Sequence, residues 1–264
     1  METGGYRQQN INSRKDPNKP VVSIITVVYN SEALLEKTIL SLSHQSYTNI
    51  EFIIIDGGSK DRTLEIIKSH NQSIAYWISE PDKGLYFAMN KGIEAATGDY
   101  IWFINSGDEI YQPLTLETII ASSNNEDVLY GNAMIIDEDS HEIGLRRLRP
   151  PLQLNKKSMQ MGMIVCHQAI IVKRPLAPLY ETKYKLAADY NWVVSILSKT
   201  TSVFNTHEIL CKYMDNGFSK NNITKAIKER FGIMVRNFGF LTTIFNHIVI
   251  SIKFFRFLFL NRRF

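Results

Sequence analysis

The sequence predicts an α/β fold in which a doubly wound, mostly parallel sheet is followed by a C-terminal amphipathic helical extension. The first observation is that β-branched apolar runs alternate with amphipathic runs between residues 20 and 109. The second is that these apolar runs stop at polar or acidic residues, as expected where such a sheet binds ligands. The third is a basic stretch, residues 216–264, whose apolar residues recur at helical spacing.

The first half of the chain has the clearest strand and helix patterns. The run VVSIITVVYN is almost wholly apolar, as expected of a strand buried on both faces of a sheet. The run EALLEKTILSLSHQ has one apolar stripe at helical spacing, which is typical of a helix with one buried face. The same alternation predicts strands at 21–30, 51–59, 74–82 and 99–106, and helices at 32–45, 60–70 and 84–97.

The pattern is looser after residue 109, although the chain still has enough apolar residues for one substantial core. Hydrophobic residues make up 44% of the 264 residues and charged residues 21%. The two cysteines have no Cys-x-x-Cys spacing, which argues against a thiolate zinc site and fits a reducing compartment. We expect helices at 114–123 and 187–199, strands at 127–137, 166–174 and 203–214, and an exposed loop at 141–158.

The two ends of the chain differ from its centre in composition. The first nineteen residues are polar, so we expect a disordered arm at 1–19 and a single domain at 20–215. Residues 216–264 contain nine Lys and Arg and one acid, Glu229, which gives this tail a formal charge of +8. The preceding 215 residues sum to −4. The tail therefore predicts a negatively charged partner.

The apolar residues of the tail predict an amphipathic helix. The apolar stretch that ends before Lys253 is too short to cross a bilayer, so the pattern favours a helix lying in a membrane interface. The alternative is a helix pair packed on the domain or in a homodimer. We expect a membrane surface as the partner, and no nucleic acid. The stripe consists of Phe231, Val235, Phe238, Leu241, Phe245, Ile248, Ile252, Phe255 and Phe259.

Two blocks of the sequence resemble family 2 glycosyltransferases. The first is VSIITVVYNSEALLEKTILSLSHQSYTNIEFIIIDGGSKDRTLEII, with its order of strand, YN, helix, QSY, strand and DGGSKDRT. The second is SEPDKGLYFAMNKGIEAATGDYIWFINSGDEI, in which DKGLYFAMNKG and NSGDE are most similar to bacterial exopolysaccharide and colanic-acid-type enzymes. The resemblance implies a GT-A fold, a nucleotide-diphosphate sugar donor, a divalent cation and inversion at the anomeric carbon. Residues 20–109 would form the nucleotide-sugar half and residues 110–215 the acceptor half.

The resemblance assigns the donor site to the ends of the first four predicted strands, with a UDP-sugar favoured. Asp56 would hold the nucleobase or ribose, and the helix start that follows Asp82 and Lys83 would favour a diphosphate. The alternatives are an ordinary strand-to-helix turn at Asp56, with Ser59 as a helix cap, and a solvated ion pair at Asp82 and Lys83. The donor-binding candidates are Thr26, Val27, Tyr29, Asp56, Asp82, Lys83, Asn90, Ser106 and Gly107.

The expected metal site departs from the family's usual pattern. Family members usually carry Asp-x-Asp or Asp-Asp at the end of the fourth strand, whereas this chain has Asn105-Ser106-Gly107-Asp108. Mg²⁺ and Mn²⁺ accept few protein oxygens when substrate phosphates complete the shell, so Asp108 alone is a sufficient carboxylate. His167 is a second candidate ligand, and its alternative is a structural role. We expect Mn²⁺ or Mg²⁺ to bind mainly together with the donor.

An inverting transfer needs one carboxylate to take the proton of the acceptor hydroxyl. The resemblance places this base at Asp189, in AADYNW, where the alternative is a helix N-cap or an acid of the first helical turn. By the same resemblance the HQA segment, His167 and Gln168, lines the acceptor and diphosphate region. MDNGFSK resembles a degenerate form of the family's glycine-serine loop, with Asn216 in place of one glycine, and Gly217 and Ser219 would close over the diphosphate.

These expectations describe a metal-dependent transferase on the cytoplasmic face of the cell membrane. It would move a sugar from a nucleotide-diphosphate sugar to a lipid-linked saccharide during surface polysaccharide assembly. The missing first carboxylate supports an alternative, a degenerate domain that binds sugar nucleotides within a membrane complex. A nucleotidyltransferase or a Rossmann oxidoreductase is disfavoured, because VVYNSEALLEK contains no glycine-rich phosphate loop.

Overall fold

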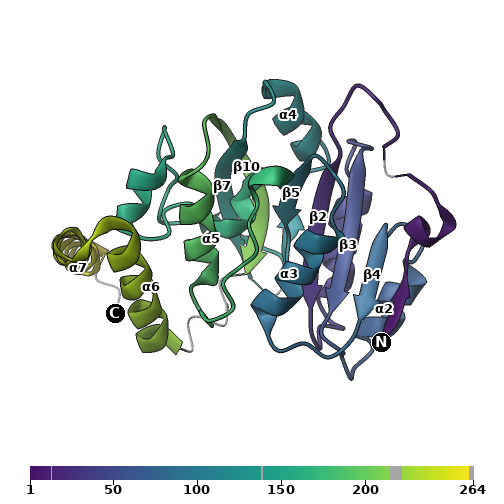
Figure 1. The fold of residues 1–264 in the computed structure, drawn as a ribbon, viewed down its shortest axis with the longest axis horizontal. Helices are drawn as coiled ribbons and strands as arrows, with labels where there is room; N and C mark the ends of the chain where they lie inside the picture. The colour runs from purple at the N-terminus through teal and green to yellow at the C-terminus, as the bar shows by residue number, and fades with distance from the viewer. Residues whose placement is uncertain (13, 138, 215–221, 262–264) are drawn as a thin grey trace.

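The computed structural model describes residues 1–12, 14–137, 139–214 and 222–261 (Figure 1). The strands are β1 (Glu2–Gly4), β2 (Val22–Val28), β3 (Ile50–Asp56), β4 (Tyr76–Ser79), β5 (Tyr100–Phe103), β6 (Glu109–Ile110), β7 (Val128–Ile136), β8 (Glu142–Leu145), β9 (Ile170–Lys173) and β10 (Val203–Met214). The α-helices are α1 (Leu35–Ser43), α2 (Thr63–Ser69), α3 (Leu85–Ala95), α4 (Thr115–Ser122), α5 (Ala188–Leu197), α6 (Ile223–Phe238) and α7 (Phe240–Asn261). Four short 3₁₀ helices are η1 (Tyr6–Gln9), η2 (Lys156–Met161), η3 (His167–Ala169) and η4 (Arg174–Leu176).

One mixed sheet runs through the described part of the molecule. Its strand order is β1-β4-β3-β2-β5-β9-β7-β10-β6, with β8 paired to β7. Strands β4, β3, β2 and β5 are parallel, and β7 is parallel to β10, whereas β9 is antiparallel to both β5 and β7. The parallel strands therefore end at one common edge, and the predicted α/β fold with a mostly parallel sheet is confirmed.

Helices cover both faces of the sheet, which explains why its central strands are apolar throughout. Every residue of β2 is buried, and so is every residue of β5. One core cluster joins the sheet to α3, α5 and α6, and a second joins it to α1, α2 and α4. Helices α3 and α5 lie in front of the sheet in Figure 1. The layers leave the carboxyl ends of the parallel strands as the place where polar side chains can meet a ligand.

The amino-terminal segment corrects the expectation of a disordered arm. Strand β1 pairs antiparallel with the edge strand β4, from Glu2 opposite Ser79 to Gly4 opposite Trp77. The Arg7 guanidinium donates to the Ala95 carbonyl at 2.7 Å and lies 3.3 Å from the Glu51 carboxylate, whose side chain is buried. Backbone pairing and one buried ion pair do not require apolar side chains, which is why the polar composition gave no sign of this order.

The tail forms two helices where the apolar stripe suggested one continuous pattern. Gly239 lies between α6 and α7 with a φ of 86°, a left-handed conformation that favours glycine and ends α6. Helix α7 packs on α6 and on η2. No helix in the described residues has the length and apolar character needed to cross a membrane.

Candidate active site

Several acids and amides lie at the edge of the sheet formed by the carboxyl ends of the parallel strands. They come from the ends of β3, β4 and β5 and from helices that pack beside them. Asp56 is the last residue of β3, and its side chain is fully buried. Its carboxylate accepts hydrogen bonds from Ser59 Oγ and Ser79 Oγ, both at 2.5 Å. Ser59 therefore holds Asp56 and does not cap α2, for which no side-chain cap is present. The arrangement fixes one carboxylate at the edge, with its oxygens already hydrogen-bonded.

The end of β2 supplies one exposed aromatic ring. Tyr29 is 62% exposed, and its ring lies against Gly57. Thr26 is buried and donates its hydroxyl to the Ile104 carbonyl at 2.6 Å, while Val27 belongs to the core. The side chains of Thr26 and Val27 are thus used inside the sheet, and only Tyr29 reaches the edge as we expected. Thr26 and Val27 do not reach the edge because helices cover both faces of β2, so side chains on either face of this strand are buried.

The loop between β4 and α3 carries an acid pair bridged by a lysine. Lys91 Nζ lies 2.7 Å from Glu80 Oε1 and also pairs with Asp82 Oδ1. The other oxygen of Asp82 is buried and has no hydrogen-bond partner among the described residues. Lys83 is exposed beside it, at a shallow cavity of ≈ 340 Å³. Asp82 is therefore a candidate to accept a hydrogen bond from a ligand hydroxyl.

Asn90 has a different role from the donor contact that the sequence suggested. Its amide group donates to the Tyr180 carbonyl at 3.0 Å, and its oxygen accepts from the Tyr180 backbone N–H at 2.7 Å. Both ends of the side chain are therefore used to fasten residue 180 to α3. This two-way clamp joins segments ninety positions apart, which a local motif does not reveal.

The turn after β5 is held in a conformation that disfavours an acid directly before Asp108. Gly107 has a φ of 93°, and a Cβ there would come within 2.8 Å of Met214 and 3.3 Å of Leu34. An aspartate at 107 is therefore strained both by its backbone and by its neighbours. Ser106 is tied by its hydroxyl to Ser31 Oγ at 2.8 Å.

Asp108 is the carboxylate that this turn delivers. It is 6% exposed, and burial raises the pKa of its carboxyl to about 7, although hydrogen bonds from Gln168 and from the backbone oppose the rise. Gln168 Nε2 donates to its Oδ2 at 2.9 Å. The Oδ1 atom of Asn105, in the same turn, is buried and has no partner among the described residues. A carboxylate and an unpaired amide oxygen are the donors that Mg²⁺ and Mn²⁺ prefer, so these residues fit a hard divalent cation.

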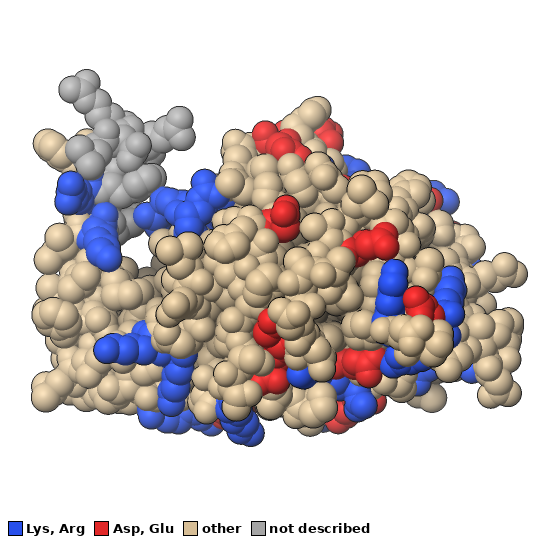
Figure 2. Space-filling model, turned by 90° about the horizontal axis from the view of Figure 1, so that it is seen from above, with Lys and Arg blue, Asp and Glu red and all other residues tan. Residues whose placement is uncertain are grey.

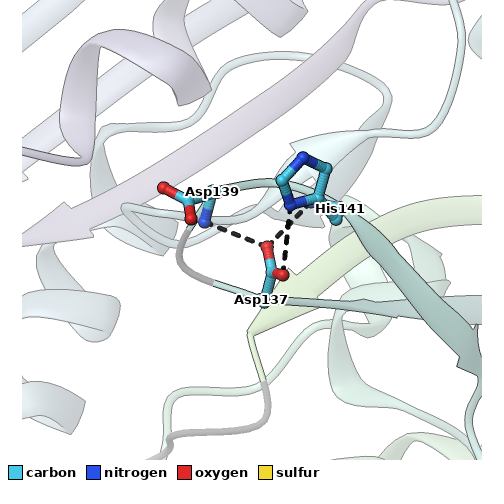
Figure 3. Close-up of side chains that lie close together, drawn as sticks. All are labelled: Asp137, Asp139 and His141. Carbon is cyan, nitrogen blue, oxygen red and sulfur yellow. Dashed lines mark hydrogen bonds and ion pairs between the residues drawn. The ribbon is translucent and has the colours of Figure 1, made fainter.

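A second group of possible metal ligands lies on the turn between β7 and β8 (Figure 3). Ligand atoms of Asp137, Asp139 and His141 lie within 4.8 Å of one another. Asp137 already accepts from the backbone N–H groups of Asp139, at 3.0 Å, and His141, at 2.8 Å. These bonds lower the pKa of Asp137, with the bond from His141 contributing most. Ser140, in the same turn, donates to Glu109 at 2.9 Å, which brings the group close to the Asp108 turn.

His167 takes a structural place, in contrast to the metal-ligand role that we considered for it. Its Nε2 is hydrogen-bonded to the Tyr180 hydroxyl at 2.6 Å, and its ring packs against Phe103 and Trp192. Burial lowers its pKa, although the charge of Asp189 opposes this effect. Gln168, the next residue, is the one that reaches Asp108. Helix η3 therefore contacts the Asp108 turn through Gln168 and the aromatic cluster of Tyr180 and Trp192 through His167.

Asp189 is the second residue of α5 and is half-buried. Ala187 is the N-cap of this helix, so Asp189 is not the cap but an acid of the first helical turn, which is the other form of its alternative interpretation. Its Oδ1 accepts from the Tyr190 backbone N–H at 2.8 Å and is 3.5 Å from the Tyr86 hydroxyl. Tyr86 stacks on Tyr180 with ring centroids 5.5 Å apart. The carboxylate therefore stands at the rim of a buried aromatic cluster.

The tail helix α6 forms part of the support for Asp189. The Glu229 carboxylate accepts from the backbone N–H groups of Lys185 at 2.9 Å, Leu186 at 2.9 Å and Ala187 at 3.1 Å. These three N–H groups directly precede α5. Sequence reasoning missed this contact, although the one acid in a basic tail was a visible signal. Gly217 and Ser219, the expected diphosphate loop, lie outside the described residues.

The comparisons with known proteins agree with one another on the type of protein. A family model for Glycosyl transferase family 2 matches residues 23–178. An uncharacterized glycosyltransferase of Mycobacterium tuberculosis is 31% identical over 84% of this chain and 86% of its own length. A PGL/p-HBAD biosynthesis glycosyltransferase of Mycobacterium bovis is 28% identical over 82% of this chain and 86% of its own length.

Two solved structures show the same fold at low sequence identity. TarS of S. aureus, in complex with UDP, superposes with a TM-score of 0.64 at 17% identity and covers 82% of this chain and 65% of that one. The mannosyltransferase PcManGT of Pyrobaculum calidifontis, in complex with GDP-Man and Mn²⁺, gives a TM-score of 0.60 at 15% identity. It covers 83% of this chain and 65% of that one. The chain thus spans about two thirds of residues 1–349 of TarS and of PcManGT, and 40% of the longer TarS chain.

Proposed function

Because the chain belongs to glycosyl transferase family 2, we propose that it moves a sugar, with inversion, from a nucleotide-diphosphate sugar to a saccharide acceptor. The observation that carries the proposal is that contacts of η3 link two acids that come from different halves of the chain. Gln168 of η3 contacts Asp108. His167 of η3 is hydrogen-bonded to Tyr180, whose ring stacks on Tyr86, and the Tyr86 hydroxyl lies 3.5 Å from Asp189. This arrangement supports a donor diphosphate at Asp108 and a reacting sugar between Asp108 and Asp189.

The donor side is proposed to use the groups that stand at the carboxyl edge. The exposed ring of Tyr29 offers a stacking face for a base, and Asp56 is held in place by two serines to accept from the nucleoside. Asp82 and the exposed Lys83 are proposed to contact the sugar and the diphosphate. We favour a UDP-sugar, which is supported by the UDP complex of TarS.

Asp108 and the Asn105 amide oxygen are the residues proposed to hold Mn²⁺ or Mg²⁺. When bound, such a cation supplies positive charge to the leaving diphosphate. The position of Gln168 keeps Oδ2 of Asp108 oriented while the nucleotide is absent. With one carboxylate in the turn, we expect weak cation binding until donor phosphates add their oxygens.

Asp189 is proposed as the base. Its carboxylate takes the proton of the acceptor hydroxyl while that oxygen forms a bond to the anomeric carbon, and the bond from this carbon to the diphosphate oxygen breaks. Among the described residues, the hydrogen bonds to this carboxylate are made at Oδ1, so they orient Oδ2 for the acceptor. Inversion follows because acceptor and leaving group lie on opposite faces of the sugar.

The acceptor is proposed to be a lipid-linked saccharide used in surface polysaccharide assembly, with residues 20–109 and 110–215 as the donor and acceptor halves. The similarity of DKGLYFAMNKG and NSGDE to exopolysaccharide enzymes supports this finer assignment. A lipid-linked acceptor also agrees with the basic tail, which favours a location on the cytoplasmic face of the membrane. A homodimer through the tail is the alternative arrangement.

A binding panel followed by a turnover assay tests the proposal. The melting temperature should rise with one class of UDP-, GDP- or dTDP-sugar and rise further with Mn²⁺, because ligands that bind only the folded state stabilise it. The stabilising donor should then release its nucleotide diphosphate in the presence of acceptor. Stabilisation without release by any common donor would support the second candidate, a sugar-nucleotide-binding domain, which the missing first carboxylate of the turn favours.

A further inference from the structure

Helix α7 exposes an apolar face that nothing in the described part of the chain covers. Its exposed apolar residues include Leu241 at 81%, Phe245 at 66% and Ile252 at 61%. Ile248 at 54% and Phe259 at 84% continue the same stripe, since residues three or four apart share one face of a helix. A contiguous apolar stripe of this length on a surface marks a place of interaction.

The inward face of the same helix is polar, so the helix is inverted relative to an ordinary surface helix. Thr243 is fully buried and donates to the Gly239 carbonyl at 2.8 Å, while Asn246 is 9% exposed. His247 packs edge-on against Phe231 of α6, with ring centroids 5.1 Å apart. Because α7 packs on α6 and η2 and these polar residues are its buried ones, its apolar stripe is directed away from the domain.

Basic side chains accompany the stripe. Lys253 and Arg256 are exposed on α7, and Lys225 and Lys228 are exposed on α6. Glu229 is the one acid between residues 216 and 264, and its carboxylate is bound to the start of α5. In Figure 2 the charged side chains visible over the α6 and α7 end of the molecule are predominantly Lys and Arg. The face therefore combines apolar side chains with positive charge.

We propose that the outward face of α7 lies in the interface of a membrane that contains anionic lipids. The basic flank selects such a surface, because each Lys or Arg near anionic headgroups adds to binding. A second copy of this chain fits the face less well, because two α7 helices would place Lys253 and Arg256 of each copy against a helix that contains no acid. Membrane binding by α7 does not depend on the proposed function. Only its role, which is to bring the enzyme to lipid-linked acceptors, rests on that function.

The same contacts show how a docked tail would face the acceptor side of the site. Arg236 of α6 is bonded to Glu181 at 2.8 Å, and Glu229 binds the N–H groups before α5. The membrane-facing helices are thus joined to the helix that carries Asp189. A lipid-linked acceptor in the membrane would therefore approach the base from the α6 and α7 side.

Flotation of the full chain with vesicles tests this surface without donor or acceptor. The wild type should float with vesicles of phosphatidylcholine mixed with phosphatidylglycerol, less with phosphatidylcholine alone, and less in high salt. The double variant Phe245→Ser/Ile252→Ser should lower the partition coefficient at least about tenfold, because two large apolar side chains no longer enter the interface. Leu114→Ser, a 61% exposed site directly before α4, is the matched control and should float like the wild type.

A charge variant and an oligomer measurement complete the test. Lys253→Gln/Arg256→Gln should weaken binding to the phosphatidylglycerol vesicles about fivefold per charge and leave binding to phosphatidylcholine unchanged. The proposal is overturned if the wild type does not float, or if the Phe245→Ser/Ile252→Ser protein floats equally well. If the wild type is a dimer that does not float, and the Phe245→Ser/Ile252→Ser protein is a monomer, the face would be assigned to a second copy. Asp189→Asn should float normally, so failure of the enzyme proposal remains distinguishable.

Discussion

Replacing Glu229 by glutamine tests whether the tail helix positions the proposed base. The carboxylate serves three backbone N–H groups, with Oε1 bound to Lys185 and Oε2 bound to Leu186 and Ala187. Glutamine has one acceptor oxygen, which can serve the last two, and its NH₂ group would then face the N–H of Lys185. The loss of one hydrogen bond and of the charge on the other two amounts to about 2 kcal/mol. The melting temperature should fall by roughly 4 to 8 °C.

Steady-state transfer kinetics show whether this loss reaches Asp189. Because the N–H groups lie directly before α5, we expect kcat to fall about tenfold or more through misplacement of the base, while KM for the donor changes little. Glu65→Gln is the control, because this substitution makes the same chemical change at an exposed position of α2. Wild-type kcat together with an unchanged melting temperature in Glu229→Gln would refute the reasoning.

Three further predictions concern other contacts. Hydrogen bonds, mainly from Thr201, lower the pKa of Asp127 from an ordinary 3.8 to about 2. The ionised carboxylate therefore stabilises the folded state fully above about pH 4, and this stabilisation is lost as the pH falls toward 2. Asp127→Asn should flatten that part of an acid unfolding curve, and an unchanged curve would be contrary to this account. Gln168→Ala should weaken Mn²⁺ affinity in the presence of nucleotide by about tenfold or more, measured by titration calorimetry, because Asp108 loses its orienting donor; equal affinity would exclude that role. Glu51→Gln should destabilise the fold by about 2 kcal/mol in urea unfolding, since its buried carboxylate is fully hydrogen-bonded; a change within error would contradict it.

The elements that the sequence predicted well are those whose identity depends on burial alone. Strands β2, β3 and β5 and helices α1 and α3 follow directly from apolar runs and helical stripes. Strand β8 was expected within a loop, because its residues are half-exposed at the sheet margin and have no apolar alternation. Strand β1 depends on backbone pairing with β4. Edge pairing leaves little trace in side-chain pattern.

The candidate site divides in the same way. Placing acids at strand ends follows from the parallel sheet, so Asp56 and Asp108 were visible in the sequence. Their partners were not visible, because they are distant in the chain: Gln168 lies sixty positions from Asp108, and Glu229 lies forty-three positions from Leu186. The clamp of Asn90 on residue 180 likewise replaced a donor-site role that a local motif had suggested.

The central claim is that Asp189 is the base of a sugar transfer, and one variant tests it most directly. Asp189→Asn keeps the size of the side chain and its hydrogen bond from the Tyr190 N–H, but cannot take the acceptor proton. We expect transfer to fall about a thousandfold while the dissociation constant for the donor with Mn²⁺ stays within a few-fold of the wild-type value. Wild-type turnover by Asp189→Asn, measured together with donor binding, would contradict the account.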